Sequence, residues 1–252
     1  MMIEGPKLAP GTVVKQRPAD GSEWRFDGRR LEGIRFERIK DGWEWLTFRD
    51  CTFADCEFVG CVLDWQLGST IPDPRAASNF ERCALTRCDL SRIGVRHVLF
   101  ADCTFESCDW EPLHLRSTDL VRNRFVGVVR GLSLWGRDDS RPGPNEIRGN
   151  DFTEADLQGL GLNAEVPADD QLWPSGDNYV RLDRKPERMQ ALRRRLKSDG
   201  DTLGLLGWLE ASEIDLRPEV LQSTDILRLD DPSMPESTLR AYRALADVVL
   251  ER

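Results

Sequence analysis

Large apolar residues recur at every fifth position through the middle of the chain. Ten successive units show this spacing without a miss, at Phe80, Leu85, Leu90, Val95, Phe100, Phe105, Trp110, Leu115, Leu120 and Phe125. A small or medium side chain stands two positions before each of them, and the other three positions are mostly polar. A period of five fits neither the 3.6 of a helix nor the 2 of a strand, so the chain must turn after every unit.

Units of this kind can close on themselves. If each unit is a short strand followed by a tight corner, four units form a square coil, and successive coils stack at about the 4.8 Å spacing of neighbouring strands. The large residue and the small residue two places before it then point inward. Backbone N–H and C=O groups pair with the coils above and below, so burial leaves few of them unsatisfied.

The repeats resemble those of the pentapeptide-repeat family. NDFTEADLQGLGL places Ala155, Asp156 and Leu157 on the A-(D/N)-L-x-x consensus, and CTFADCEFVGCVL matches the form that bears cysteine. The similarity covers residues 24–163. It implies a mainly β fold, a right-handed quadrilateral β-helix.

The five-residue rhythm breaks in three places. Two extra residues before Trp43 predict a bulged corner at Asp41 and Gly42. The longer breaks, 64–79 and 126–146, contain IPDP and RPGP, whose prolines cannot donate into a ladder. We expect both to be loops that project from the coil, either as tolerated insertions or as recognition loops.

Candidate partner contacts come from these loops and from one wall of the coil. Exposed tryptophans with Arg and Asp beside them would supply an anchor and its polar rim. One wall is expected to bring acidic residues together, with Arg92 among them. The candidate partner-binding residues are Trp65, Gln66, Asp89, Asp109, Glu111, Trp135, Arg137, Asp138 and Asp139.

All seven cysteines fall at the small inward position, five residues apart within each group, rather than at the spacing of paired zinc ligands. We expect free thiols that serve as small core residues, with Cys83 stacked beneath Cys103 and Cys88 beneath Cys108. Neither a G-x-S-x-G elbow nor a G-x-x-x-x-G-K phosphate loop occurs. We therefore expect no catalytic site, no metal and no cofactor.

The rhythm stops after Asn163, where helical periodicity begins. It appears in PERMQALRRRLKSDG, DTLGLLGWLEA, RPEVLQSTDILRL and PESTLRAYRALADVVLER. The spacing predicts a buried stripe of Met189, Leu192 and Leu196 in the first segment, and one buried face in the last that is made by Leu239, Tyr242, Leu245, Ala246 and Val249. The predicted organisation is an N-terminal extension at 1–23, the β-helix at 24–163, a linker at 164–180 and a helical C-terminal region at 181–252. The helical region is expected to cap the open end of the coil, or to serve in dimerisation or partner docking.

The composition limits the partners. The formal net charge of -9 argues against a basic groove for nucleic acid phosphates. No apolar run approaches the roughly 20 residues that span a bilayer, and the first residues lack the features of a secretory signal. We expect a cytoplasmic protein that binds neither nucleic acid nor membrane directly.

The resemblance also implies a function. Family members with assigned roles include proteins that bind DNA gyrase and protect it from quinolones or peptide toxins by presenting an acidic surface shaped like duplex DNA. The first hypothesis is therefore a non-catalytic DNA mimic that binds gyrase, although arginines interrupt the acidic positions here. The alternative is an immunity or antitoxin-like protein, or a scaffold, that binds a protein through its loops and helical cap. A homodimer through the C-terminal helices is a further expectation.

Overall fold

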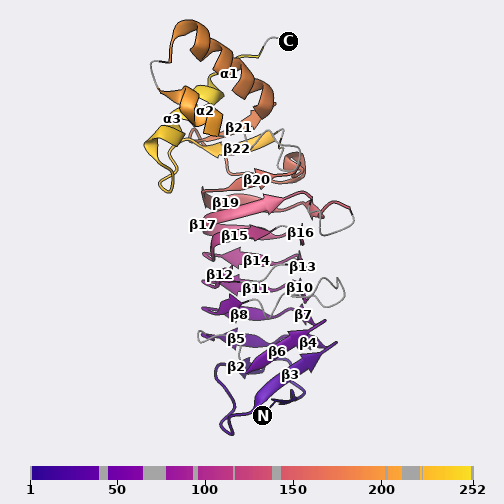
Figure 1. The fold of residues 1–252 in the computed structure, drawn as a ribbon. Coiled ribbons are helices and arrows are strands. Elements are labelled where there is room, and N and C mark those ends of the chain that lie inside the picture. The colour runs from indigo at the N-terminus through magenta and orange to yellow at the C-terminus, as the bar shows by residue number, and fades with distance from the viewer. Residues whose placement is uncertain are drawn as a thin grey trace.

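The computed structural model describes the chain outside residues 1, 40–44, 65–77, 93–95, 116, 138–142, 202–203, 212–221, 223 and 251–252, and outside the side chains of 64, 92, 96–97, 111–114 and 211. Short parallel strands stack into an elongated four-walled tube, a quadrilateral β-helix (Figure 1). The N-terminus lies at one end of the tube and a small unit with three helices lies at the other.

Each wall is a ladder of strands from successive coils. Wall 1 begins with β1 (Met2–Glu4), β3 (Glu23–Asp27) and β6 (Leu46–Arg49). Wall 2 holds β4 (Arg30–Glu32), β7 (Thr52–Ala54), β10 (Asn79–Glu81), β13 (Arg96–Ala101), β16 (Ser117–Val121) and β18 (Ile147–Arg148).

The remaining strands share one continuous sheet that bends round the corners of the tube. Wall 3 holds β2 (Val13–Val14), β5 (Arg35–Glu37), β8 (Glu57–Val59), β11 (Ala84–Thr86), β14 (Thr104–Glu106) and the first parts of β17 (Arg124–Trp135) and β19 (Asp151–Gln158). Wall 4 holds β9 (Val62–Asp64), β12 (Asp89–Arg92) and the start of β15 (Asp109–Leu115), followed by the middle of β17 and the end of β19. The ends of β15 and β17, with β20 (Gly161–Asn163), continue wall 1.

Fifth-position residues fill the lumen, as predicted. Phe100 and Trp110 are 0% exposed and Phe105 is 1% exposed. Aromatic rings stack along wall 3, where the centroids of Phe105 and Phe125 lie 5.0 Å apart and those of Phe125 and Phe152 lie 4.3 Å apart. Because burial of one such ring stabilises the fold by about 1.5–3 kcal/mol, this column is a main source of the tube's stability.

The chain turns at the second residue after the large one. There the backbone enters the left-handed region, with φ of 51° at Asp55, 52° at Arg82 and 56° at Asp102. Glycine holds the equivalent place at Gly33 and Gly149. A residue other than glycine costs about 1–2 kcal/mol in this conformation, which the ladder hydrogen bonds of the flanking strands offset.

Both ends of the tube extend beyond the predicted bounds. The expected N-terminal extension is the first coil, because β1 pairs with β3 and β2 pairs with β5. The expected linker at 164–180 continues the tube, since Val166 and Ala168 are buried in its core. Trp173 stacks on Phe152 at a centroid distance of 4.9 Å. The prediction missed both coils because their apolar residues leave the five-residue spacing.

The loop expected at 126–146 is also wrong over its first ten residues. β17 runs through them without interruption, and Val129 and Leu134 are buried in the lumen opposite Leu157 and Leu162 of the next coil. The step from Phe125 to Val129 is four residues instead of five, so every later inward position moves by one. The bulge that was expected before Trp43 lies outside the described residues.

The C-terminal unit contains a sheet as well as helices. Its described elements are strands β21 (Tyr179–Asp183) and β22 (Thr224–Arg228), and helices α1 (Lys185–Asp199), α2 (Leu205–Ala211) and α3 (Glu236–Ala246); the 3-10 turn η3 (Ala168–Asp170) precedes them in the last coil of the tube. β21 and β22 pair antiparallel, so the expected third helix is a strand at Thr224–Arg228, where pairing with β21 buries Ile226 and Leu227.

The helical predictions hold for the other three segments. Met189, Leu192 and Leu196 form the buried stripe of α1, as expected. Val249 was expected on the buried face of α3 but is 90% exposed, because the helix ends at Ala246. Within the part of the chain that the structure describes, no helix is long and apolar enough to cross a membrane.

Candidate partner-binding surfaces

Charges alternate along the corner between walls 2 and 3. Arg82 donates two hydrogen bonds to the carboxylate of Asp55, at 2.8 and 2.7 Å, and Arg122 donates two to Asp102, both at 2.7 Å. The strand register places Arg82 beside Asp102, so the order along the tube is Asp55, Arg82, Asp102, Arg122. These arginines lower the pKa of Asp55 and of Asp102. The corner is therefore a ladder of opposite charges that neutralise each other.

The outer surfaces of walls 2 and 3 carry further ion pairs between different coils. They join Arg30 to Glu81, Arg35 to Glu57 and Arg124 to Glu154. Such exposed pairs contribute little to stability, about 0–1 kcal/mol each. Their consequence is electrostatic, because each arginine interrupts what would otherwise be a row of carboxylates.

Wall 4 brings two predicted site residues together. Asp89 of β12 lies directly opposite Asp109 of β15, and Asp109 lies opposite Arg130 of β17. Asp89 is half-buried and accepts hydrogen bonds from the backbone N–H and the hydroxyl of Ser91, at 2.9 and 2.5 Å. The side chain of Glu111 lies outside the described residues. The acidic column on this wall thus ends at Arg130.

The predicted loop residues have different fates. Trp135 was expected on a projecting loop but lies in β17, where it is half-buried and its indole N–H donates to the Ser133 hydroxyl at 3.2 Å. Arg137 is exposed, and its backbone forms an isolated antiparallel bridge with Pro144. The remaining predicted loop residues, which lie outside the described part of the chain, are Trp65, Gln66, Asp138 and Asp139.

The two longer breaks of the rhythm are both followed by a strand of the same wall. β10 is the first described strand after residues 65–77, and β18 is the first after residues 138–142. β10 and β18 belong to the wall 2 sheet, separated by β13 and β16. The sequence did not show this, because the wall of each break depends on the exact length of every earlier unit.

Wall 2 carries both apolar and charged residues on its outer surface. Its outward positions include Ala54, Leu99, Ala101 and Val121, and the Arg30–Glu81 ion pair joins coils on either side of Ala54. Ala54 is 0% exposed and Val121 is 4% exposed, whereas the other two are half-buried. The sequence did not indicate these residues as candidates, because the predicted contacts were charged residues and exposed tryptophans. Of these four residues, Leu99 and Ala101 are therefore the ones that a partner could contact.

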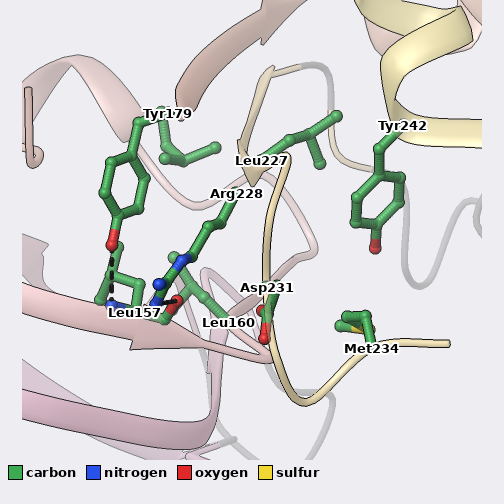
Figure 2. A pocket seen from close by; sticks show the side chains of 9 residues that line it. Leu157, Leu160, Tyr179, Leu227, Arg228, Asp231, Met234 and Tyr242 are labelled. Carbon is green, nitrogen blue, oxygen red and sulfur yellow. Dashed lines mark hydrogen bonds between the residues drawn. The ribbon is translucent and has the colours of Figure 1, made fainter. Parts of the chain in front are cut away.

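A small cleft lies between the end of the tube and the C-terminal unit. Figure 2 shows Tyr179, Arg228 and Asp231 around it, with the hydrogen bond from the Leu157 N–H to the Tyr179 hydroxyl, 3.1 Å long. Arg228 is ion-paired with Asp156 on β19, and its guanidinium lies 5.9 Å from the centroid of the Tyr179 ring.

The polar groups of this cleft hold the two parts of the protein together. Asp231 accepts the backbone N–H of Gly159 at 2.6 Å and two hydrogen bonds from Ser233. Arg228 also donates to Asp230 at 2.9 Å. Since each charged group already has a partner across or beside the junction, the cleft joins the C-terminal unit to the tube and offers no free acid or base.

The cysteines form columns inside the tube, as predicted. The backbone N–H of Cys83 donates to the sulfur of Cys103 at 3.4 Å. Contact with the thiol of Cys103, together with burial, raises the pKa of Cys83 to about 12, and Cys108 does the same for Cys88. All seven cysteines are buried free thiols. Among the described residues, no group of three or more His, Cys, Asp or Glu side chains could hold a metal ion.

Comparison with known proteins finds similar solved structures. No protein-family model and no curated protein matches the sequence. The chain is similar to the trypsin-treated form of QnrB1, a plasmid-mediated fluoroquinolone resistance protein, at 14% identity and a TM-score of 0.36 over 69% of this chain and 86% of that one. Full-length QnrB1 aligns at 16% identity and a TM-score of 0.28, over 64% of this chain and 81% of that one. At these scores the likeness does not by itself assign a function.

Proposed function

We propose that this protein is a non-catalytic binding protein that docks a protein partner on wall 2 of its tube, with DNA gyrase as the most specific candidate. The observation that carries the proposal is that residues 65–77 and 138–142 are each followed by a strand of wall 2, whose outer surface carries apolar residues among ion-paired charges. A stacked, closed tube gives such a wall a rigid frame, so docking costs little ordering of the main chain. Gyrase enters through the resemblance of the repeats to the pentapeptide-repeat family.

The charge pattern favours protein docking over imitation of duplex DNA. Duplex DNA carries one negative charge per about 1.7 Å of its axis, unbroken by positive charge. Here Arg82 and Arg122 alternate with Asp55 and Asp102 along one corner, and Arg130 ends the acidic column of wall 4. We therefore propose contact through shape and mixed polar groups, with the wall 4 carboxylates in a secondary role.

The same charge pattern also supports a second candidate. A wall that mixes apolar residues with ion-paired charges suits an ordinary protein interface, which as a whole is about as apolar as the rest of a protein surface. An immunity-type or scaffold protein that binds a toxin or another protein would use such a wall without any requirement for a DNA-like surface.

A supercoiling assay with purified gyrase, with and without a fluoroquinolone, tests the first candidate. We expect the wild-type protein to inhibit supercoiling or to protect gyrase from the drug. Replacement of residues 138–142 by two glycines should weaken this effect at least about tenfold, whereas Asp89→Asn with Asp109→Asn should retain it.

The outcomes separate the two candidates and the two modes of binding. Loss of activity in the Asp89→Asn, Asp109→Asn variant, with the glycine variant unaffected, would overturn docking on wall 2 in favour of the acidic column. Glu236→Gln, on α3 at the far end of the chain, is the matched control for the loss of one exposed carboxylate. If the wild-type protein leaves gyrase unchanged, gyrase is the wrong partner, and binding to the product of the neighbouring gene becomes the test.

A further inference from the structure

The first coil leaves two strand edges open. β1 is the end strand of wall 1 and β2 is the end strand of wall 3, and no strand of the described part of the chain pairs with their outer edges. Three of their five residues are apolar and exposed: Met2 is 51% exposed, Ile3 36% and Val13 46%. Unpaired edges with apolar side chains are a template for pairing with another strand.

The two open edges lie on opposite sides of the lumen. Wall 1 and wall 3 face each other, and the ring centroids of Phe48 and Phe36 meet across the tube at 6.1 Å. The other two sides of the first coil carry prolines that cannot donate hydrogen bonds. Pro6 and Pro10 lie between β1 and β2, and Pro18 lies between β2 and β3. Open and blocked edges therefore alternate around this end.

We propose that this end of the tube binds a second copy of the chain, end to end. The two-fold axis is perpendicular to the tube and passes through the middle of walls 1 and 3. Rotation by 180° about it places the partner's wall 1 against wall 1 and the partner's wall 3 against wall 3, with the strands running in the opposite direction. One rotation therefore pairs β1 with the partner's β1 and β2 with the partner's β2, both antiparallel. Wall 2 of one copy then lies against wall 4 of the other, so the proline-bearing sides meet where no backbone N–H donor is required.

The arrangement of side chains fits this symmetry. In the three-residue strand β1 the central residue is Ile3, which comes to lie beside the partner's Ile3. β2 consists of Val13 and Val14, so its pairing is apolar on both sides. The contact is small, and we expect a dimer with a dissociation constant in the micromolar range. Assembly ends at two copies, because the opposite end of the tube is covered by the C-terminal unit.

The C-terminal helices are a competing dimer surface, and the test must separate the two. Their buried apolar residues already pack into one core, which includes Leu192 of α1, Leu209 of α2 and Leu245 of α3. Sedimentation of the wild-type protein at about 100 μM should give twice the monomer mass of 28.7 kDa. Ile3→Lys combined with Val13→Lys should restore the monomer mass, and Val249→Lys, a control on an exposed valine near the helices, should remain dimeric.

Cross-linking tests the geometry itself. The native cysteines are all buried, so a cysteine at position 3 would be the accessible thiol of the protein. Ile3→Cys should form a disulfide-linked dimer under mild oxidation, whereas Val128→Cys, on the side of the tube and 39% exposed, should stay monomeric. A wild-type monomer at about 100 μM, or a lysine variant that is still dimeric, would overturn the proposal. Circular dichroism confirms that each variant is folded.

Discussion

The two ends of the tube differ in how their last hydrogen-bonding layer is covered. At the C-terminal end, Trp173 covers the last lumen ring, Phe152, and the β21–β22 sheet lies above it. At the N-terminal end, β1 and β2 keep their outer edges open. A stack of coils has a last hydrogen-bonding layer at each end, and the comparison shows that this chain provides for only one of them within the described residues.

The closed end is prepared by a change of chemistry inside the tube. In the middle of one column, Cys103 accepts the backbone N–H of Cys83 at 3.4 Å. Asn123 and Asn150 take the same place further along and accept the N–H of the preceding column residue at 2.9 and 3.0 Å. Gln171 ends the column by accepting the N–H of Asn150 at 3.0 Å. Amide side chains thus replace thiols near the C-terminal end of the stack.

The largest effect is expected from the amide column. Asn150→Leu should lower the free energy of unfolding by about 3–5 kcal/mol, because it leaves the N–H of Asn123 and the carbonyl of Leu120 buried without their partner. Asn150→Cys should cost only about 1–2 kcal/mol, since Cys103 performs the same task with a thiol. Guanidinium denaturation measures both. Equal losses would show that the amide bonds do not close this end.

Next in size is the cover of the lumen. Trp173→Ala should cost about 2–4 kcal/mol, because it removes the ring that stacks on Phe152 and the indole bond to the Ala168 carbonyl. Trp173→Phe keeps a ring in place and should cost less than about 1.5 kcal/mol. Thermal unfolding compares them. A large loss for both would point to the indole N–H instead of the stack.

The junction between tube and C-terminal unit should give a smaller effect. Arg228→Met removes the ion pairs with Asp156 and Asp230 and should cost about 1–2 kcal/mol. Limited proteolysis should then cut faster between the two parts. Arg243→Met, whose exposed partner is Glu236, is the control and should change stability by at most about 1 kcal/mol. Unchanged proteolysis of the Arg228 variant would remove the junction role that we give this residue.

The corner ladder is expected to matter least, and only above about pH 4. Arg82 and Arg122 lower the pKa of Asp55 and Asp102, so the stabilisation is present above the unfolded pKa of about 3.9 and is lost as the pH falls through the lower folded values. Asp55→Asn with Asp102→Asn should therefore lower the denaturation midpoint slightly at pH 7 and leave it equal to that of the wild type in strong acid, so the midpoint falls less steeply below about pH 4 in the variant. A steeper fall in the variant would contradict this sign.

Periodicity predicted the tube well and its ends poorly. Inward placement of Phe100, Phe105 and Trp110 followed from spacing alone, because a lumen accepts a large side chain only at one position of each unit. The single four-residue step from Phe125 to Val129 broke the spacing, so a loop was predicted where the structure has strand β17. The end coils were missed for a related reason, because their apolar residues leave the five-residue spacing. Each end coil packs against a regular coil on one side only.

The candidate site was predicted only in part. Spacing correctly placed Asp89 beside Asp109, because their separation is one full coil. It could not place Arg130 against Asp109, since that contact depends on the shortened unit. Trp135 was expected to be exposed because a polar surrounding suggested a loop, whereas the strand register buries half of it. That residues 65–77 and 138–142 both precede a strand of wall 2 could not be predicted, because it depends on the register of every coil.

Hydrogen exchange measured at two protein concentrations tests the contrast between the ends most directly. At low concentration, the amides of β1 and β2 should exchange fast, and those of β18 and β19 next to the amide column should exchange slowly. Raising the concentration to about 100 μM should slow exchange in β1 and β2 only, because a second copy then covers their edges. Exchange in β1 and β2 that is slow at every concentration, or fast exchange at the C-terminal end, would contradict the account.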